Sequence, residues 1–64
     1  MRFEIGDIVV LKGDTRLLMS VVAVEAAAGD ELVTCSWYDE TGALREEVHR
    51  SQQLEHNLPS PTMH

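Results

Sequence analysis

Two short segments rich in β-branched and aromatic residues most strongly constrain what this chain can fold into. Residues 8–11 read Ile-Val-Val-Leu and follow the turn-forming pair Gly6-Asp7. Residues 32–38 alternate between two sets of side chains, Val33, Cys35 and Trp37 against Thr34, Ser36 and Tyr38. Both patterns are typical of strands, and the alternation indicates an antiparallel sheet with one face in the core and one in water.

The segment between them is compatible with a helix or a strand. It spans residues 17–26 and carries three valines within four positions, at 21, 22 and 24. Valine favours a strand, and apolar groups on both of its faces fit a strand that changes sides through a bulge near Val22-Ala23. We expect loops before and after it, over residues 14–16 and 26–30.

The next residues predict a hairpin and a returning strand. Residues 39–42, Asp-Glu-Thr-Gly, form the turn, because Gly42 adopts a positive φ readily. Residues 43–49 form the strand, with Leu44 and Val48 facing the core. Glu46 lies between them and falls on that same face by strict alternation.

The C-terminal part predicts one short turn and a tail. Residues 51–54 are typical of a single 3-10 turn capped by Ser51, after which Leu54 and Leu58 pack back onto the core. Residues 59–64 are expected to form a flexible tail.

The length of the chain suits one small domain. Sixty-four residues bury only about 60% of their unfolded surface, which leaves little volume for a deep cleft. We therefore expect a single all-β domain over residues 1–58, a small SH3-like barrel of four to five antiparallel strands, without enzymatic activity. An OB-type barrel usually needs a longer chain.

A series of motifs shares its order and spacing with one known family. The motifs are Phe3, Ile5-Gly6-Asp7, Val9, Leu11-Lys12-Gly13, Met19-Ser20-Val21, Val33-Thr34-Cys35, Trp37-Tyr38-Asp39 and Leu54-Glu55. Over residues 3–55 they resemble the YodC-like family of small uncharacterised bacterial proteins. The resemblance implies a compact β-barrel in a bacterial or phage cytoplasm, and it brings no catalytic residues. Residues 25–31 depart from the family as a lengthened loop, and the tail after Leu58 also departs.

The charge is strongly acidic. Eleven Asp and Glu against five Lys and Arg give a formal net charge of -6, which disfavours direct nucleic-acid binding. A nucleic-acid binder of the KOW type requires one shared face for the basic residues Lys12, Arg16, Arg45 and Arg50. The acidic excess serves solubility or forms an anionic surface for a basic partner. An anionic binding surface requires that the following acidic residues lie together on one side of the molecule: Glu25, Asp30, Glu31, Glu40, Glu46 and Glu47.

Other features favour a reducing compartment without membrane contact. Cys35 is the only cysteine, so an internal disulfide is excluded. No apolar run approaches the roughly 18 residues of a membrane span, and residues 1–4 do not begin a signal peptide. These features predict a cytoplasmic protein.

Catalytic, metal and cofactor sites are not expected. Cys35 lies in an alternating strand, where a small buried side chain is the simpler interpretation than a nucleophile activated by His49. The histidines His49, His56 and His64 match no compact metal-ligand spacing.

The strongest candidate site is a protein-binding patch. If Trp37 faces the core, Tyr38 points outward beside the 39–42 turn, and exposed aromatics are enriched at contact surfaces. We therefore predict partner contacts at Tyr38, Asp39, Glu40 and Arg45. A free edge strand also predicts pairing with a partner strand or a homodimer. The function expected is a protein-interaction module, with an acidic inhibitor of a nucleic-acid-binding enzyme as the alternative.

Overall fold

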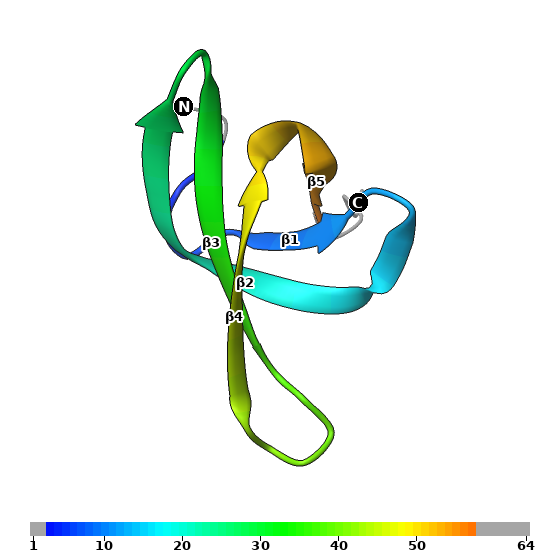
Figure 1. Cartoon of the computed structure of the whole chain (residues 1–64). Helices are drawn as coiled ribbons and strands as arrows, with labels where there is room; N and C mark the ends of the chain where they lie inside the picture. Colours follow the sequence, from blue (N-terminus) through cyan, green and yellow to red (C-terminus); the bar gives the residue numbers. More distant parts are fainter. Residues whose placement is uncertain (1–2, 58–64) are drawn as a thin grey trace, which may run out of the picture.

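The computed structural model describes residues 3–57, which form one antiparallel sheet of five strands (Figure 1). The elements are β1 (Ile8–Leu11), β2 (Asp14–Ala27), β3 (Asp30–Tyr38), β4 (Leu44–Arg50), the 3-10 turn η1 (Ser51–Gln53) and β5 (Leu54–His56). The predicted all-β fold and its short 3-10 turn are confirmed. Among residues 3–57 the strand order β4-β3-β2-β1-β5 leaves β4 and β5 as unpaired edges, so the predicted closed barrel is not confirmed.

A tight turn joins β1 to β2. Leu11 pairs with Asp14 across Lys12-Gly13, and Gly13 takes a φ of 89°. The predicted loop over residues 14–16 is therefore wrong, because these residues already belong to β2. A glycine that adopts positive φ without steric cost allows the chain to reverse within two residues.

A second tight turn joins β2 to β3. Ala27 pairs with Asp30, and the two turn residues between them both have positive φ, 43° at Ala28 and 84° at Gly29. The predicted loop over 26–30, and the lengthened loop over 25–31, are therefore wrong. A turn with two positive-φ residues matches the right-handed twist of the two strands, so β2 and β3 stay paired up to the residues that flank the turn.

The predicted bulge in β2 is confirmed. Val21 pairs with Cys35 but Ala23 pairs with Thr34, so Val22 is an extra residue in this ladder. Because of that extra residue, Val24 lies opposite Val33 and returns to the same side of the sheet as Val21. Figure 1 shows β2 bending sharply along its course, from β1 toward the turn with β3.

A single apolar layer covers one face of the sheet, called the core face below. Its fully buried side chains are Phe3, Val9, Met19, Val21, Val33, Cys35 and Leu54. Partly buried side chains pack against this layer, namely Leu11, Leu17, Val24 and Trp37. The inward positions predicted for Val33, Cys35 and Leu54 are confirmed. Leu58 and the tail 59–64 lie outside the described residues.

The faces of β4 are the reverse of those predicted. The register places Arg45, Glu47 and His49 opposite Trp37, Cys35 and Val33, on the core face. Leu44 and Val48 lie on the opposite, outer face and are 55% and 58% exposed, so their predicted inward position is wrong. The reason is the ladder with β3, because a residue shares its face with the residue directly across from it.

The turn η1 is held by a contact other than the one predicted. Its N-cap position is Arg50, not Ser51. The Arg50 amide donates to Gln53 Oε1 at 3.2 Å, whereas the buried Ser51 hydroxyl donates to Asp30 Oδ1 at 2.6 Å. The serine therefore joins η1 to the start of β3.

Truncation of one buried and one exposed leucine tests the arrangement of the core. We expect Leu54→Ala to lower the free energy of unfolding by about 2–5 kcal/mol, since Leu54 is fully buried in a single-layer core. Leu44→Ala should change it by less than about 0.5 kcal/mol. Urea denaturation measures both, and a large loss for Leu44→Ala would contradict the outward position of that residue.

The β2–β3 turn predicts a stabilising substitution. Ala28 has a φ of 43°, a region that alanine adopts at a steric cost and asparagine tolerates well. Ala28→Asn creates the Asn-Gly pair preferred in such turns, and it should raise the free energy of unfolding by roughly 0.5–1 kcal/mol. Ala28→Val should lower it. Thermal denaturation of the three proteins gives the order, and equal stability would contradict the turn geometry.

Candidate interaction surface

The end of the β3–β4 hairpin extends beyond the neighbouring strand. The last pairing of β2 with β3 is Ser20 with Ser36, so in the part of the chain that the structure describes no third strand pairs with residues 37–45. This two-stranded projection, called the β3–β4 arm, is visible in Figure 1 as the loop furthest from β1 and β5. It carries all four predicted contact residues.

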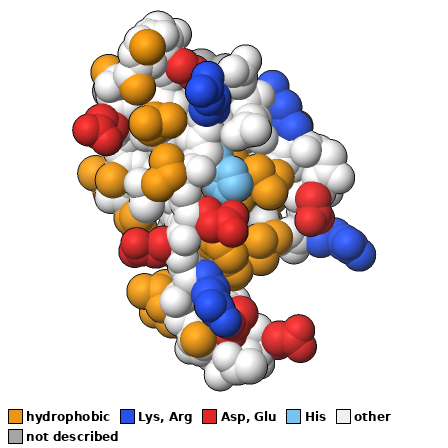
Figure 2. All heavy atoms as spheres, viewed as in Figure 1, with side chains coloured by type: hydrophobic (Ala, Val, Ile, Leu, Met, Phe, Trp, Pro, Cys, Tyr) orange, Lys and Arg blue, Asp and Glu red, His pale blue; other side chains and the backbone are white. Residues whose placement is uncertain are grey.

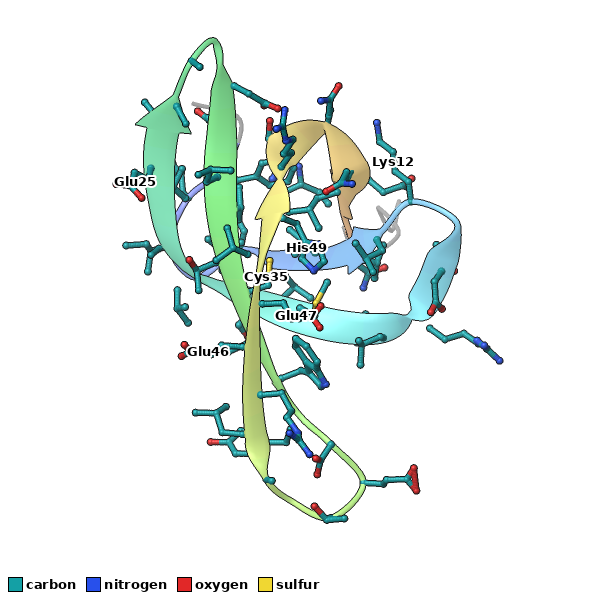
Figure 3. All side chains as sticks on the ribbon, in the orientation of Figure 1. Lys12, Glu25, Cys35, Glu46, Glu47 and His49 are labelled. Atoms are coloured by element: carbon teal, nitrogen blue, oxygen red, sulfur yellow. The ribbon has the colours of Figure 1, made fainter. Side chains whose placement is uncertain are left out.

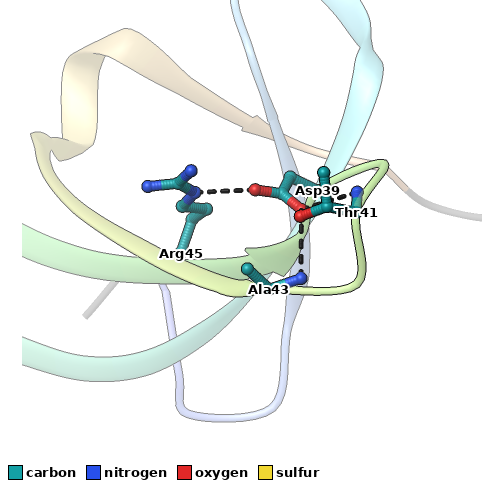
Figure 4. Close-up of polar contacts among 4 residues, drawn as sticks. All are labelled: Asp39, Thr41, Ala43 and Arg45. Atoms are coloured by element: carbon teal, nitrogen blue, oxygen red, sulfur yellow. Dashed lines mark hydrogen bonds and ion pairs between the residues drawn. The ribbon is translucent and has the colours of Figure 1, made fainter.

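One carboxylate organises the turn at the end of the arm. Asp39 Oδ1 accepts hydrogen bonds from the Thr41 amide at 2.9 Å, the Thr41 hydroxyl at 2.6 Å and the Ala43 amide at 3.0 Å (Figure 4). Its Oδ2 accepts one from Arg45 Nε at 2.8 Å. These bonds satisfy the orphan donors of the turn and fix the approach of β4 to β3.

The same contacts set the acidity of Asp39. Hydrogen bonds from Thr41 first, and from Arg45 second, lower the pKa of its carboxyl from 3.8 to about 2. Asp39 and Arg45 are therefore engaged with each other and with the turn, which assigns them a structural role in the arm. Glu40 is exposed on the turn itself.

The structure separates Tyr38 from Arg45. Tyr38 lies opposite Leu44, while Arg45 lies opposite Trp37, so the tyrosine and the arginine point to different faces of the arm. Tyr38 is 73% exposed, as predicted. Its neighbour across the ladder is the exposed Leu44 and not Arg45, the other predicted contact residue on β4.

The outer face of β3 and β4 carries three exposed apolar side chains, called the apolar strip below. These are Tyr38, Leu44 and Val48. Glu46, opposite Ser36, lies between the last two, and Figure 3 shows it on the other side of β4 from Glu47. Sequence reasoning missed Leu44 and Val48. The length of the turn that begins at Asp39 was the sequence signal for their outward position, because a turn of this length sets Leu44 opposite Tyr38 in the ladder.

Charged residues are spread over the molecule. Glu25 and Glu46 lie on the outer face and Glu47 on the core face, while Asp30 and Glu40 lie at opposite ends of β3. Figure 2 shows acidic, basic and apolar side chains interspersed over the visible face. This scatter does not form the single anionic surface that an acidic inhibitor requires.

The basic residues are also dispersed. Lys12 lies in the β1–β2 turn and Arg16 in the first part of β2. Arg45 and Arg50 both belong to β4 but lie on opposite faces, opposite Trp37 and Leu32 respectively. They form no common face of the kind a phosphate backbone would follow.

The cysteine and the described histidines are engaged within the fold. Cys35 is fully buried, burial raises the pKa of its thiol, and its Sγ lies 3.7 Å from the Val33 carbonyl oxygen. His49 Nε2 lies 3.1 Å from Glu47 Oε1, and His56 Nε2 lies 3.0 Å from Asp7 Oδ2. Residues 3–57 hold no group of three or more potential metal-ligating side chains. His64 lies outside the described residues.

An open hollow of about 850 Å³ lies beside η1. It is lined by residues 26–31 with Ser51 and Gln52. Asp30 connects β3 to η1 here, because its carboxylate accepts hydrogen bonds from the Ser51 hydroxyl at 2.6 Å and from Gln52 Nε2 at 3.3 Å. The polar groups here hold η1 against the β2–β3 turn.

No family model, curated protein or solved structure matches the chain. The resemblance to the YodC-like family therefore stays a prediction from the motifs. Within residues 3–57 there is no helix of the length and apolarity needed to cross a membrane.

The Asp39 network predicts a pH-dependent difference in stability. Because the folded-state pKa is about 2, below the ordinary 3.8, the charged carboxylate stabilises the fold above about pH 4. That stabilisation is lost as the pH falls through about 2. Asp39→Asn should therefore be less stable than the native chain at neutral pH, and the difference should shrink toward zero as the pH approaches 2.

Urea midpoints at a series of pH values measure this difference. Glu40→Gln removes one charge from the same turn and serves as the matched control, whose midpoint should follow that of the native chain. A difference between Asp39→Asn and the native chain that grew on acidification would contradict the assigned role of the carboxylate.

Proposed function

We propose that this chain is a non-enzymatic protein-interaction module that binds its partner through the apolar strip on the outer face of β3 and β4. The observation that carries the proposal is the exposure of Tyr38, Leu44 and Val48 on one face of the β3–β4 hairpin. The turn of this hairpin is stabilised by Asp39. Large apolar side chains gathered on the surface of a small protein are characteristic of contact sites. Tyrosine is among the residues that contribute most to such contacts.

The rigidity of the arm supports the proposal. Asp39 ties the turn to Arg45, so the positions of Tyr38 and Leu44 are set before a partner arrives. A pre-organised surface loses less conformational entropy on binding than a flexible loop does. The partner surface that fits is apolar where it meets Tyr38 and Leu44, with a hydrogen-bond donor for Glu46.

The topology supports an SH3-like arrangement of the sheet, which we propose as its fold type. The features in favour are the strand order, the 3-10 turn between β4 and β5, and the pairing of β5 with β1. The free, buried thiol of Cys35 suits a reducing compartment, and we propose a cytoplasmic protein. The dispersed acidic residues favour solubility over nucleic-acid mimicry.

A comparison of immobilised variants tests the proposed binding face. The native chain, Tyr38→Ser/Leu44→Ser and the control Ile5→Ser are used to capture proteins from the native cell. Ile5 is 72% exposed and precedes β1, so its change removes exposed apolar surface from outside the arm. We expect one partner to be retained by the native chain and the control.

The double variant should bind that partner at least about 10-fold more weakly, the loss typical of a central aromatic contact. Affinities measured with the purified partner give the ratio. Equal binding by all three proteins would show that the partner uses another surface.

A further inference from the structure

We propose that two copies of this chain pair through the free edges of their β4 strands, antiparallel and centred on Val48. The pairing joins two five-stranded sheets into one continuous sheet. It goes beyond the proposed function because it uses the backbone edge of β4 and leaves the outer face accessible to a partner.

Alternate residues of β4 direct their backbone N–H and C=O groups away from β3, toward the unpaired edge of the strand. The Asp39 amide donates to the Ala43 carbonyl at 3.0 Å, which sets the alternation of hydrogen-bonded pairs along the β3–β4 ladder. That alternation turns the N–H and C=O groups of Leu44, Glu46 and Val48 away from β3. The Arg50 amide also points outward and donates to Gln53 Oε1 at 3.2 Å, which confirms the direction at the far end of the strand.

The side chains of β4 complement a second copy of themselves in one register. A two-fold axis at Val48 places Val48 opposite Val48 of the second copy. Two residues either side, Glu46 then lies opposite Arg50, and on the core face Glu47 lies opposite His49. Opposite charges directly across a ladder are favourable, and like charges there are unfavourable. Glu47 and His49 already lie 3.1 Å apart within one chain, so they are compatible hydrogen-bonding partners.

The neighbouring registers are less complementary. A two-fold axis at Glu47 or at Glu46 places that glutamate opposite itself. The axis at Glu46 also pairs Arg45 with Glu47 and Leu44 with Val48, so it is the strongest competing register. An axis at His49 places the histidine opposite itself and Val48 opposite Arg50. Registers displaced by an odd number of residues bring the core face of one copy beside the outer face of the other. The axis at Val48 alone places both glutamates opposite basic residues.

The edge lacks two of the devices that block such pairing, although it carries inward charges at Arg45 and Glu47. Natural edges are kept apart by proline, by bulges and by inward charges that repel a second strand. The ladder of β4 with β3 is regular from Tyr38–Leu44 to Leu32–Arg50, without a bulge, and β4 contains no proline. Its charges favour the register centred on Val48, in which Glu46 faces Arg50 and Glu47 faces His49.

Analytical ultracentrifugation with charge-reversal variants tests the pairing. The native chain should show a reversible monomer–dimer equilibrium between about 10 µM and about 1 mM, as expected for an interface smaller than standard size, in about 0.15 M salt to screen the net charge. Glu46→Arg and Arg50→Glu each place like charges across the ladder, so each should weaken association at least about 10-fold. The same changes at exposed positions outside β4, Glu25→Arg and Arg16→Glu, serve as controls and should have no such effect.

Mixing the two weakened variants supplies the decisive result. An arginine at position 46 of one chain then faces a glutamate at position 50 of the other at one end of the interface, and the native pair of Arg50 with Glu46 remains at the other end. The mixture should therefore regain dimer, as should the double variant E46R/R50E. A monomeric native chain at 1 mM, native-like association of either single variant, or a mixture that stays monomeric would overturn the proposal.

Amide hydrogen exchange of the native chain gives a measurement that needs no variant. Exchange at Glu46 and Val48 should slow as the protein concentration rises, because these amides become hydrogen-bonded in the dimer. The Glu55 amide, on the opposite edge strand β5, should keep its rate. Concentration-independent exchange at Val48 would overturn the pairing.

Discussion

The bulge at Val22 is the constraint on which the sheet depends. β2 is long enough to serve as partner to β1 through its first part and to β3 through its second part. Without an extra residue, strict alternation would turn Val24 toward water when Val21 faces the core. The bulge returns Val24 to the core face and bends the strand, so one thin apolar layer can be assembled from Met19, Val21 and Val33.

The predictable parts of the fold were those with a strong local pattern. The alternation around Val33 and Cys35 identified β3 and its buried face, and the run of valines at positions 21, 22 and 24 identified a bulged strand. The tight turn at Ala28-Gly29 was not predicted, because Ala28 is an unfavourable residue for positive φ and gave no turn signal beyond its glycine neighbour. Tertiary pairing at that point outweighed local preference.

The candidate site was predicted in part, and the errors have one physical cause. Tyr38 is exposed as expected, whereas Leu44 and Val48 were placed inside because apolar residues are usually buried. That rule fails on an edge strand, where only the ladder with β3 decides the face of each side chain. Asp39 holds the turn between the two strands through its bonds to Thr41 and Ala43, and this turn leads into the register that places Leu44 opposite Tyr38.

The polar core face of β4 also affects the interior. Beside Val33 and Cys35 the sheet presents His49 and Glu47, where a sealed barrel would present hydrocarbon. If β5 paired with β4 and closed the sheet, the Glu47 carboxylate would lose its hydration, which is costly without a matching cation. The charged core face of β4 therefore disfavours closure of the sheet by β5, and residues 3–57 form an open sheet. A second copy paired as proposed differs from β5 in this respect, because it brings His49 opposite the same carboxylate.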